Sequence, residues 1–312
     1  MLRDRALELQ LVRSLGDFQK EVRPIPGITT PERRAAFIGQ IVESVRRIRY
    51  ISVISERKLT PLRSDPTSVL FDPIQAAVLH RRAGEIDEAF WLVFLSVHFG
   101  KNLRTGWNLA RNVYAGAGSG GHWDWERTSA DPGAFRKWLD AHEKILSSGA
   151  TPGRFGNHRK YQSLSATSPS GTGAAFETYI RWVNPPDTHE VLISDARSAV
   201  GPHPRKMFDH LYRSMKAVAS FGRTARFDYL TMIGKLSLAT IEAGSTYMQG
   251  ATGPLTGARL LFTGNETGDL SRVSADAFVI ELEAFLRVGM QVMEDSLCNW
   301  QKSPDAFKAF RG

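Results

Sequence analysis

Three carboxylates stand where they could take part in charge-stabilising chemistry. Asp228 lies among cations on a predicted helix, and Asp276 lies in the first turn of a later one. Glu294, beside Asp295, comes near the end of that later helix, where an acid opposes the helix dipole and needs a partner cation or a function. A carboxylate can stabilise positive charge on a sugar and orient a water. We expect Asp276 to be catalytic, with Asp228 or Glu294 as alternatives. The simpler interpretation of Asp276 is an acid that complements a helix dipole.

The stretch 249–261 reads Gln-Gly-Ala-Thr-Gly-Pro-Leu-Thr-Gly-Ala-Arg-Leu-Leu and predicts a tight turn between two helices. Glycines allow a positive φ and a close approach of the backbone to a ligand. The free amides of a helix's first turn suit a phosphate. We therefore expect a helix–hairpin–helix that holds a DNA strand by its backbone, through Gly253, Gly257 and Arg259. The alternative is an ordinary helix corner, with Gly253-Pro254 as its stop and start signals.

A second candidate DNA contact is the run from Phe155 to Tyr161, which lies in a long predicted loop. It combines an amide, an imidazole, two cations and two aromatic rings beside a glycine. The cations can hold phosphates while Tyr161 or Phe155 stacks on a base. A solvated basic loop is the alternative. The residues expected to contact DNA here, with one cation from an earlier turn, are Asn157, His158, Arg159, Lys160 and Lys101.

Aromatic residues suggest where an expelled base could lie. Trp123 and Trp125 flank Asp124 beside a glycine-rich turn, so they either line a pocket or anchor the core with the acid solvated between them. Tyr161 and Tyr229 complete the predicted base pocket.

Composition narrows the class of protein. The chain has 312 residues, is 42% hydrophobic and carries a net charge of +8, which favours a polyanionic partner. Its single cysteine, Cys298, excludes an internal disulfide and a four-cysteine metal site. No metal-binding, phosphate-loop or dinucleotide-binding motif is present, so we expect no metal and no cofactor. The longest apolar run, 89–97, is too short to cross a membrane and the N-terminus is no signal peptide, so we expect a cytoplasmic protein with no membrane or protein partner.

Apolar residues recur at helical spacing along the chain, and no convincing strand pattern appears. The sequence therefore predicts an all-α, multi-helix fold. A loop rich in Ser, Gly and Pro at 147–172 either lies within a single catalytic domain, 1–312, or joins two lobes, 1–150 and 172–312. The expected helices begin near or span residues 7–15, 31–48, 73–83, 85–98, 105–115, 132–145, 172–183, 190–198, 204–218, 225–236 and 274–297.

Several motifs together resemble one family. The chain is similar to the α-glutamyl/putrescinyl thymine pyrophosphorylase family over roughly residues 35 to 311. Proteins of that family are associated with hypermodified bases in phage and bacterial DNA. The resemblance rests on His-Phe-Gly-Lys at 98–101, Phe-Gly-Asn-His-Arg-Lys-Tyr at 155–161, Thr-Gly-Pro-Leu-Thr-Gly-Ala-Arg at 252–259 and Glu-Asp-Ser-Leu-Cys-Asn-Trp-Gln-Lys at 294–302.

One branch resembles DNA glycosylases that excise glucosylated hydroxymethylcytosine from phage genomes, and this chain fits that branch best. The resemblance implies a helix–hairpin–helix glycosylase-like architecture acting on double-stranded DNA with modified bases. Asp276 then matches the catalytic aspartate that follows the hairpin in such enzymes. Leu255 stands where bifunctional members carry a lysine, so a monofunctional enzyme that leaves an abasic site is expected. The alternatives are a transferase that displaces diphosphate from an activated hydroxymethyl pyrimidine, and a non-catalytic DNA-binding module.

Overall fold

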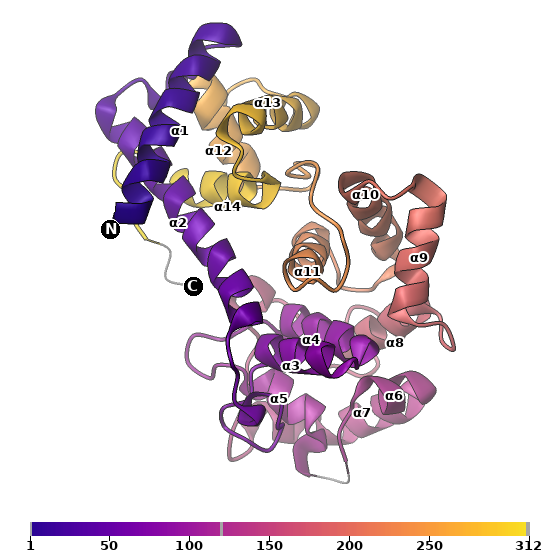
Figure 1. The fold of residues 1–312 in the computed structure, drawn as a ribbon. Helices are drawn as coiled ribbons and strands as arrows, with labels where there is room; N and C mark the ends of the chain where they lie inside the picture. The colour runs from indigo at the N-terminus through magenta and orange to yellow at the C-terminus, as the bar shows by residue number, and fades with distance from the viewer. Residues whose placement is uncertain (1, 119–120, 310–312) are drawn as a thin grey trace. The chain divides into compact units, whose positions relative to one another are not determined.

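The fold is all-α, as the sequence predicts. The computed structural model describes residues 2–118 and 121–309, and within these ranges 65% of the structure is helical, with fourteen α-helices and no strand (Figure 1). None of the described helices combines the length and the apolar character that crossing a bilayer requires.

The chain divides into two compact units. The first joins the N-terminal and C-terminal parts of the described chain, residues 2–52 and 243–309, and the second comprises the described residues between 53 and 242. The loop 147–172, expected as a joint between lobes, therefore lies wholly inside the second unit.

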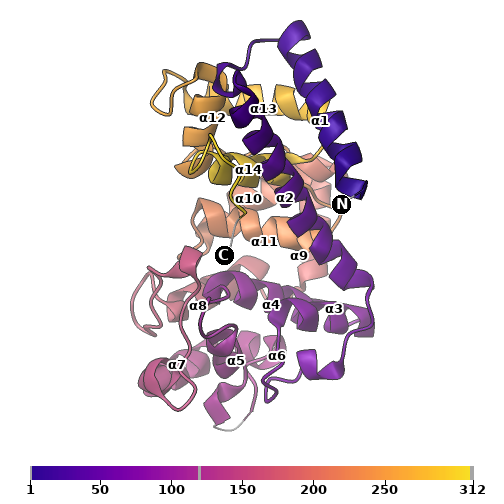
Figure 2. The same ribbon diagram turned by 90° about the vertical axis from the view of Figure 1, so that its left-hand side faces the viewer.

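The first unit packs its C-terminal helices against α1. Its elements are α1 (Leu2–Glu21), η1 (Pro26–Ile28), most of α2 (Pro31–Glu56), α12 (Gly253–Thr263), α13 (Arg272–Leu286) and α14 (Met290–Trp300). Helix α12 lies against α14 and α13 lies against α1, as both ribbon views show (Figures 1 and 2). Aromatic edges close this core, with Phe18 on Phe285 at 5.4 Å and Phe37 on Trp300 at 5.1 Å between ring centroids.

The second unit is organised around α4, in which every residue from Ala89 to Phe99 is buried. A helix that is apolar all round must be covered on every side, and α3, α5, α6, α9 and α11 pack around it. The unit's helices are α3 (Pro73–Ala83), α4 (Ile86–Phe99), α5 (Asn108–Tyr114), α6 (Trp125–Ala130), α7 (Pro132–Ser148), α8 (Thr172–Val183), α9 (His189–Val200), α10 (Pro204–Ser214) and α11 (Arg223–Lys235), with single turns η2 (Pro61–Arg63), η3 (Gly116–Gly118), η4 (Asn157–Arg159) and η5 (Met215–Ala217).

Two expectations about elements are wrong. No tight hairpin precedes α12, because α11 ends at Lys235 and residues 236–252 run outside any helix. The helix expected at 274–297 is two helices: α13 begins after its cap Ser271, and the backbone turns with positive φ at Arg287 and Gly289 before α14. Helix α13 ends at Leu286 because its C-cap Arg287 takes a left-handed φ of 53°, and Gly289, with a φ of 89°, precedes the first turn of α14.

Candidate functional site

Asp276 binds the segment 245–248, which leads into the glycine-rich residues 249–253 at the start of α12. We call residues 249–253 the glycine corner. Its Oδ1 accepts hydrogen bonds from Thr246 N (3.1 Å), Thr246 Oγ1 (2.6 Å) and Ser245 Oγ (3.1 Å). Its Oδ2 accepts from Met248 N at 2.9 Å. Four donors from three neighbouring residues thus orient one half-buried carboxylate. These bonds tie Asp276 to the segment just before the stretch 249–261, which is not a hairpin, and the catalytic role of Asp276 stays a prediction.

The backbone that Asp276 binds is strained at Tyr247. Tyr247 takes a left-handed φ of 50° between the two amides that Asp276 holds. Such a conformation costs a non-glycine residue about 1–3 kcal/mol and persists only where the surroundings impose it. Asp276 is part of what imposes it. Gly250 follows with a φ of 79°, so the positive φ expected in this stretch occurs there.

The two glycines expected to face DNA pack against α14. A Cβ on Gly257 would lie 2.3 Å from the carbonyl oxygen of Leu297, and one on Gly253 would lie 2.7 Å from Cys298 Sγ. Gly257 is buried, whereas Gly253 is only partly covered. Arg259 donates from Nε to the carbonyl oxygen of Leu270 at 3.2 Å. Close helix packing therefore accounts for Gly257, and the start of α12 near Gly253 stays the accessible part of the corner.

In the second unit, the basic loop is anchored by Arg159 from within. The Arg159 side chain is 9% exposed, its Nε donates to the carbonyl oxygen of Val97 at 2.7 Å, and its Nη2 lies 2.9 Å from Asp228 Oδ2. Arg159 and Asp228 are thus an ion pair that fixes the loop to α4 and α11, which leaves the surface positions of the loop to His158 and Lys160. The side chain of Asn157 lies outside the described residues.

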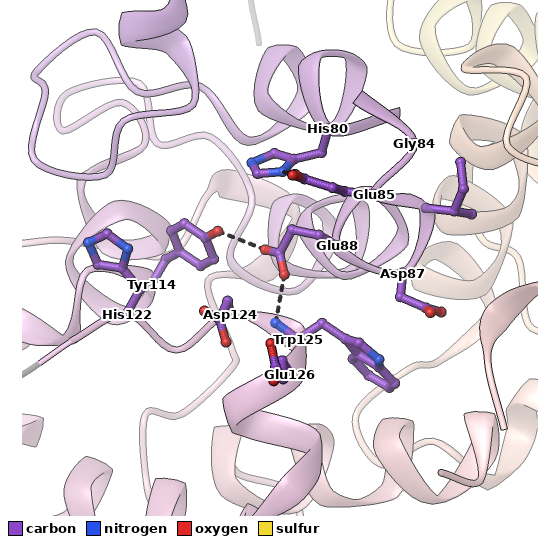
Figure 3. A pocket seen from close by; sticks show the side chains of 11 residues that line it. His80, Gly84, Glu85, Asp87, Glu88, Tyr114, His122, Asp124, Trp125 and Glu126 are labelled. Carbon is purple, nitrogen blue, oxygen red and sulfur yellow. Dashed lines mark hydrogen bonds and ion pairs between the residues drawn. The ribbon is translucent and has the colours of Figure 1, made fainter. Parts of the chain in front are cut away.

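A pocket of about 570 Å³ opens at the N-terminal end of α4 (Figure 3). Five of its lining residues are carboxylic acids, and none is Lys or Arg. The lining comprises His80, Gly84, Glu85, Ile86, Asp87, Glu88, Tyr114, His122, Asp124, Trp125 and Glu126. Side chains that accept hydrogen bonds therefore predominate, and a ligand rich in donors fits them.

Glu88 is the least solvated acid of this pocket. Its carboxylate accepts from Tyr114 Oη at 2.7 Å and from Trp125 N at 2.7 Å (Figure 3). Burial raises the pKa of Glu88 to about 6, because the two hydrogen bonds only partly offset the loss of water around the charge. An acid with a pKa near neutrality can exchange a proton during a reaction.

The neighbouring Asp87 has the opposite environment. His189, fully buried, donates to Asp87 Oδ1 from its backbone N at 2.7 Å and from Nδ1 at 2.5 Å. Burial opposes ionisation of Asp87, but these bonds outweigh it and hold its pKa below the usual range. Burial lowers the pKa of His189. A neutral imidazole with its proton on Nδ1 then accepts at Nε2 from Tyr179 Oη at 2.7 Å, and Tyr229 Oη lies 2.6 Å further on.

The comparisons with known proteins decide the family. The model of the alpha-glutamyl/putrescinyl thymine pyrophosphorylase family, clade 3, matches residues 32–312. The chain belongs to this family. No curated protein and no solved structure matches it. Membership makes it one of a family of enzymes that act on modified bases of DNA.

Within this family member, the predicted base-pocket residues are dispersed. Only Trp125 lines the pocket. Trp123 is 2% exposed and packs on Phe135, and Tyr229 is wholly inside. Tyr161 lies at the surface, 91% exposed. Trp123 thus belongs to the core, and Trp125, 9% exposed, both packs on Trp91 and lines the pocket.

The remaining predicted residues occupy other places. Lys101 is exposed just after α4. Glu294 is half-buried on α14. Its neighbour Asp295 pairs with Arg47, and Lys302 Nζ donates to Asn299 Oδ1 at 3.0 Å. Among residues 2–118 and 121–309, no cluster of three or more His, Cys, Asp or Glu has the arrangement of a metal site.

The sequence did not reveal the pocket acids Asp87 and Glu88, nor His189, which donates hydrogen bonds to Asp87 without lining the pocket itself. Both acids lie in the first turn of an apolar helix, where attraction to the helix dipole already explains an acid. His189 is far from them in sequence. Tyr247 had no signal either, because a left-handed φ on a tyrosine has no sequence signature.

Proposed function

We propose that the protein is a monofunctional DNA N-glycosylase that excises a hypermodified pyrimidine, a glucosylated hydroxymethyl base, from phage DNA in anti-phage defence. The observation that carries this is Asp276, a carboxylate oriented by four donors beside a strained residue at the glycine corner. Membership in a family of enzymes that act on modified DNA bases supports it.

The reaction needs a fixed negative charge and a water. When the bond between C1′ of the sugar and the base nitrogen breaks, positive charge develops on the sugar, and a preorganised carboxylate stabilises it. Water then adds its hydroxyl to C1′ and its proton to the departing base. Asp276 suits this task because its donors hold the carboxylate in place before substrate arrives. Asp228 and Glu294 are second choices, since Asp228 already neutralises Arg159.

The residue at the position of the lyase lysine, Leu255, does not support a lyase step. Bifunctional glycosylases need an amine to attack C1′, and Leu255, at the expected position, is a buried leucine. The product of the proposed reaction is therefore an intact strand with an abasic site.

DNA would be held by its backbone. In the second unit the exposed Lys101, His158 and Lys160 would contact phosphates, with Arg159 fixing the loop that carries two of them. In the first unit the start of α12 near Gly253 offers backbone amides.

The experiment is mass spectrometry of nucleobases released from glucosylated phage DNA and from unmodified DNA. We expect the wild type to release only the modified base. Asp276→Asn, which keeps the side chain's shape, should slow release by about a hundredfold or more while DNA affinity stays within about twofold. Asp269→Asn, an exposed acid in the same unit, is the matched control and should be fully active.

Two outcomes would count against this proposal. No released base from any glucosylated DNA would refute the glycosylase itself. Full activity of Asp276→Asn, or loss of its folding and DNA binding together with its activity, would make Asp276 structural and turn attention to Asp228→Asn.

A second candidate function is favoured by the pocket of Figure 3. A transferase that installs an amine must bind an ammonium group, which has three donors and no acceptor and so complements a lining of five acids without Lys or Arg. Glu88 would take a proton from the amine, whose nitrogen then attacks the activated methylene carbon while the bond from carbon to diphosphate breaks. The name of the family, which includes a putrescinyl group, agrees with such a substrate. Pyrophosphate release from DNA carrying an activated hydroxymethyl pyrimidine, dependent on putrescine, would select this function over base excision.

A further inference from the structure

Hydrogen bonds join two loops of the second unit to each other and to the C-terminal end of α4. We call them the paired loops, residues 101–106 and 154–161. Gly156 N donates to the carbonyl oxygen of Phe99 at 2.8 Å, and Asn102 Nδ2 donates to that of Phe155 at 2.9 Å. A Cβ on Gly156 would lie 2.9 Å from the carbonyl oxygen of Lys101, so only glycine permits this approach.

The first of the paired loops displays a leucine on a closed turn. Asn102 and Gly106 exchange backbone hydrogen bonds at 3.0 and 2.9 Å. Asn102 Oδ1 accepts from Arg104 N at 2.9 Å and from Thr105 N at 3.1 Å. The backbone of the turn is therefore ordered, yet Leu103 at its tip is 65% exposed.

The second of the paired loops displays a tyrosine. Tyr161 is 91% exposed, and Lys160 Nζ lies 5.0 Å from the centre of its ring. Arg159 anchors this loop from beneath through Val97 and Asp228. Both loops thus hold an apolar or aromatic side chain in water on a backbone that is fixed from below.

The charged side chains within the two loops are all basic, and Asp228, which contacts the second loop, is paired with Arg159. Neither loop contains a single Asp or Glu. The exposed cationic or titratable basic residues of the paired loops are Lys101, Arg104, Arg154, His158 and Lys160. A polyanion is the partner that fits such a rim, and an apolar side chain inside it requires an apolar surface within that polyanion.

We propose that Leu103 and Tyr161 are wedges that enter the base stack of DNA while the surrounding cations hold the phosphates. Stacked bases are the apolar surface within a polyanion. Because this inference rests on the proposed action on DNA, the wedges would hold open the duplex from which a nucleotide has been expelled.

The energetics suit this role. Expelling a nucleotide costs a few kcal/mol of stacking and pairing. An inserted side chain recovers part of that cost, and an aromatic ring on a base contributes about 1–3 kcal/mol. A prefixed backbone reduces the entropy lost on insertion. Leu103 and Tyr161 are therefore positioning residues for the opened strand and not catalytic groups.

The test separates strand opening from chemistry. The full chain is bound to a duplex that carries 2-aminopurine next to the target pyrimidine, and fluorescence reports unstacking without any need for base release. Leu103→Ala and Tyr161→Ala should each reduce the fluorescence gain and weaken duplex affinity by about five- to tenfold. A second duplex, with an abasic site opposite the target, leaves that base unpaired beforehand, and there both variants should bind within about twofold of the wild type.

Val69→Ala is the matched control, because Val69 is 84% exposed in a different loop of the same unit. It should change neither measurement. The proposal is overturned if both variants open the paired duplex as well as the wild type, or if they weaken binding equally on both duplexes. If the wild type opens the duplex and the two variants do not, but no base is released, the glycosylase is refuted and the wedge role of Leu103 and Tyr161 is retained.

Discussion

At the residue scale, the fold raises the pKa of Glu88 and thereby makes stability depend on pH. Its pKa lies near 6 because burial disfavours the charge, whereas the unfolded chain titrates near 4.5. The folded state therefore binds more protons between these values, so stability falls as pH rises through them and the loss is complete above about pH 6. A displacement of this size corresponds to about 2 kcal/mol.

Glu88→Gln should remove this penalty. Its amide oxygen can accept from Trp125 N and its NH₂ can donate to Tyr114 Oη, so the local hydrogen bonds survive. We expect the variant, relative to the wild type, to gain about 2 kcal/mol between pH 4 and pH 7.5, measured by urea unfolding at both pH values. Glu126→Gln, an exposed acid of the same pocket, should show no such change. If the difference in unfolding free energy between Glu88→Gln and the wild type is the same at both pH values, folding does not raise the pKa of Glu88.

At the scale of elements, the sequence correctly predicted the helix ends that are set by local capping hydrogen bonds and backbone conformation. Asp72 caps α3 by accepting from Ile74 N and Gln75 N, and Gly84 ends it with a φ of 82°. The bounds of α8 agree with those expected. The break at 287–289 was missed because the apolar spacing continues from α13 into α14, and periodicity cannot detect an interruption that keeps the buried face in phase.

For the candidate site, too, the sequence indicated positions along the chain but not the contacts that packing creates. Asp276 was predicted near the glycine stretch from its position in the sequence, and its hydrogen bonds reach Thr246 and Met248, just before that stretch. The contact between the pocket acid Asp87 and His189, in contrast, forms only through the packing of α9 on α4. Gly257 was assigned to DNA because a glycine in a helix's first turns serves a ligand or a neighbouring helix equally well, and only the distance to Leu297 decides between them.

Gly257→Ala tests that packing. The new Cβ would meet the carbonyl oxygen of Leu297 at 2.3 Å, and because that atom belongs to the backbone, α12 and α14 must separate. We expect a loss of about 1–3 kcal/mol in unfolding free energy. Gly16→Ala is the matched control: it lies on α1 in the same unit with nothing within 4 Å of its Cβ, and should gain about 0.5–1 kcal/mol. Equal stability of Gly257→Ala and the wild type would return Gly257 to the surface that meets DNA.

At the scale of the whole molecule, the net charge of +8 makes a quantitative claim about DNA. Each phosphate that a cation neutralises releases counterions, so the logarithm of affinity falls with the logarithm of salt by about 0.9 per contact. Lys101 and Lys160 are exposed and free of any acid in their own loops, so each should count fully. Lys101→Gln and Lys160→Gln should each make the slope shallower by about 1, and the double variant by about 2. Lys137→Gln, an exposed cation on α7, is the control and should leave the slope unchanged. Because general screening acts on every charge alike, a slope altered equally by all three single variants would mean that the protein attracts DNA through its overall charge and not through the paired loops.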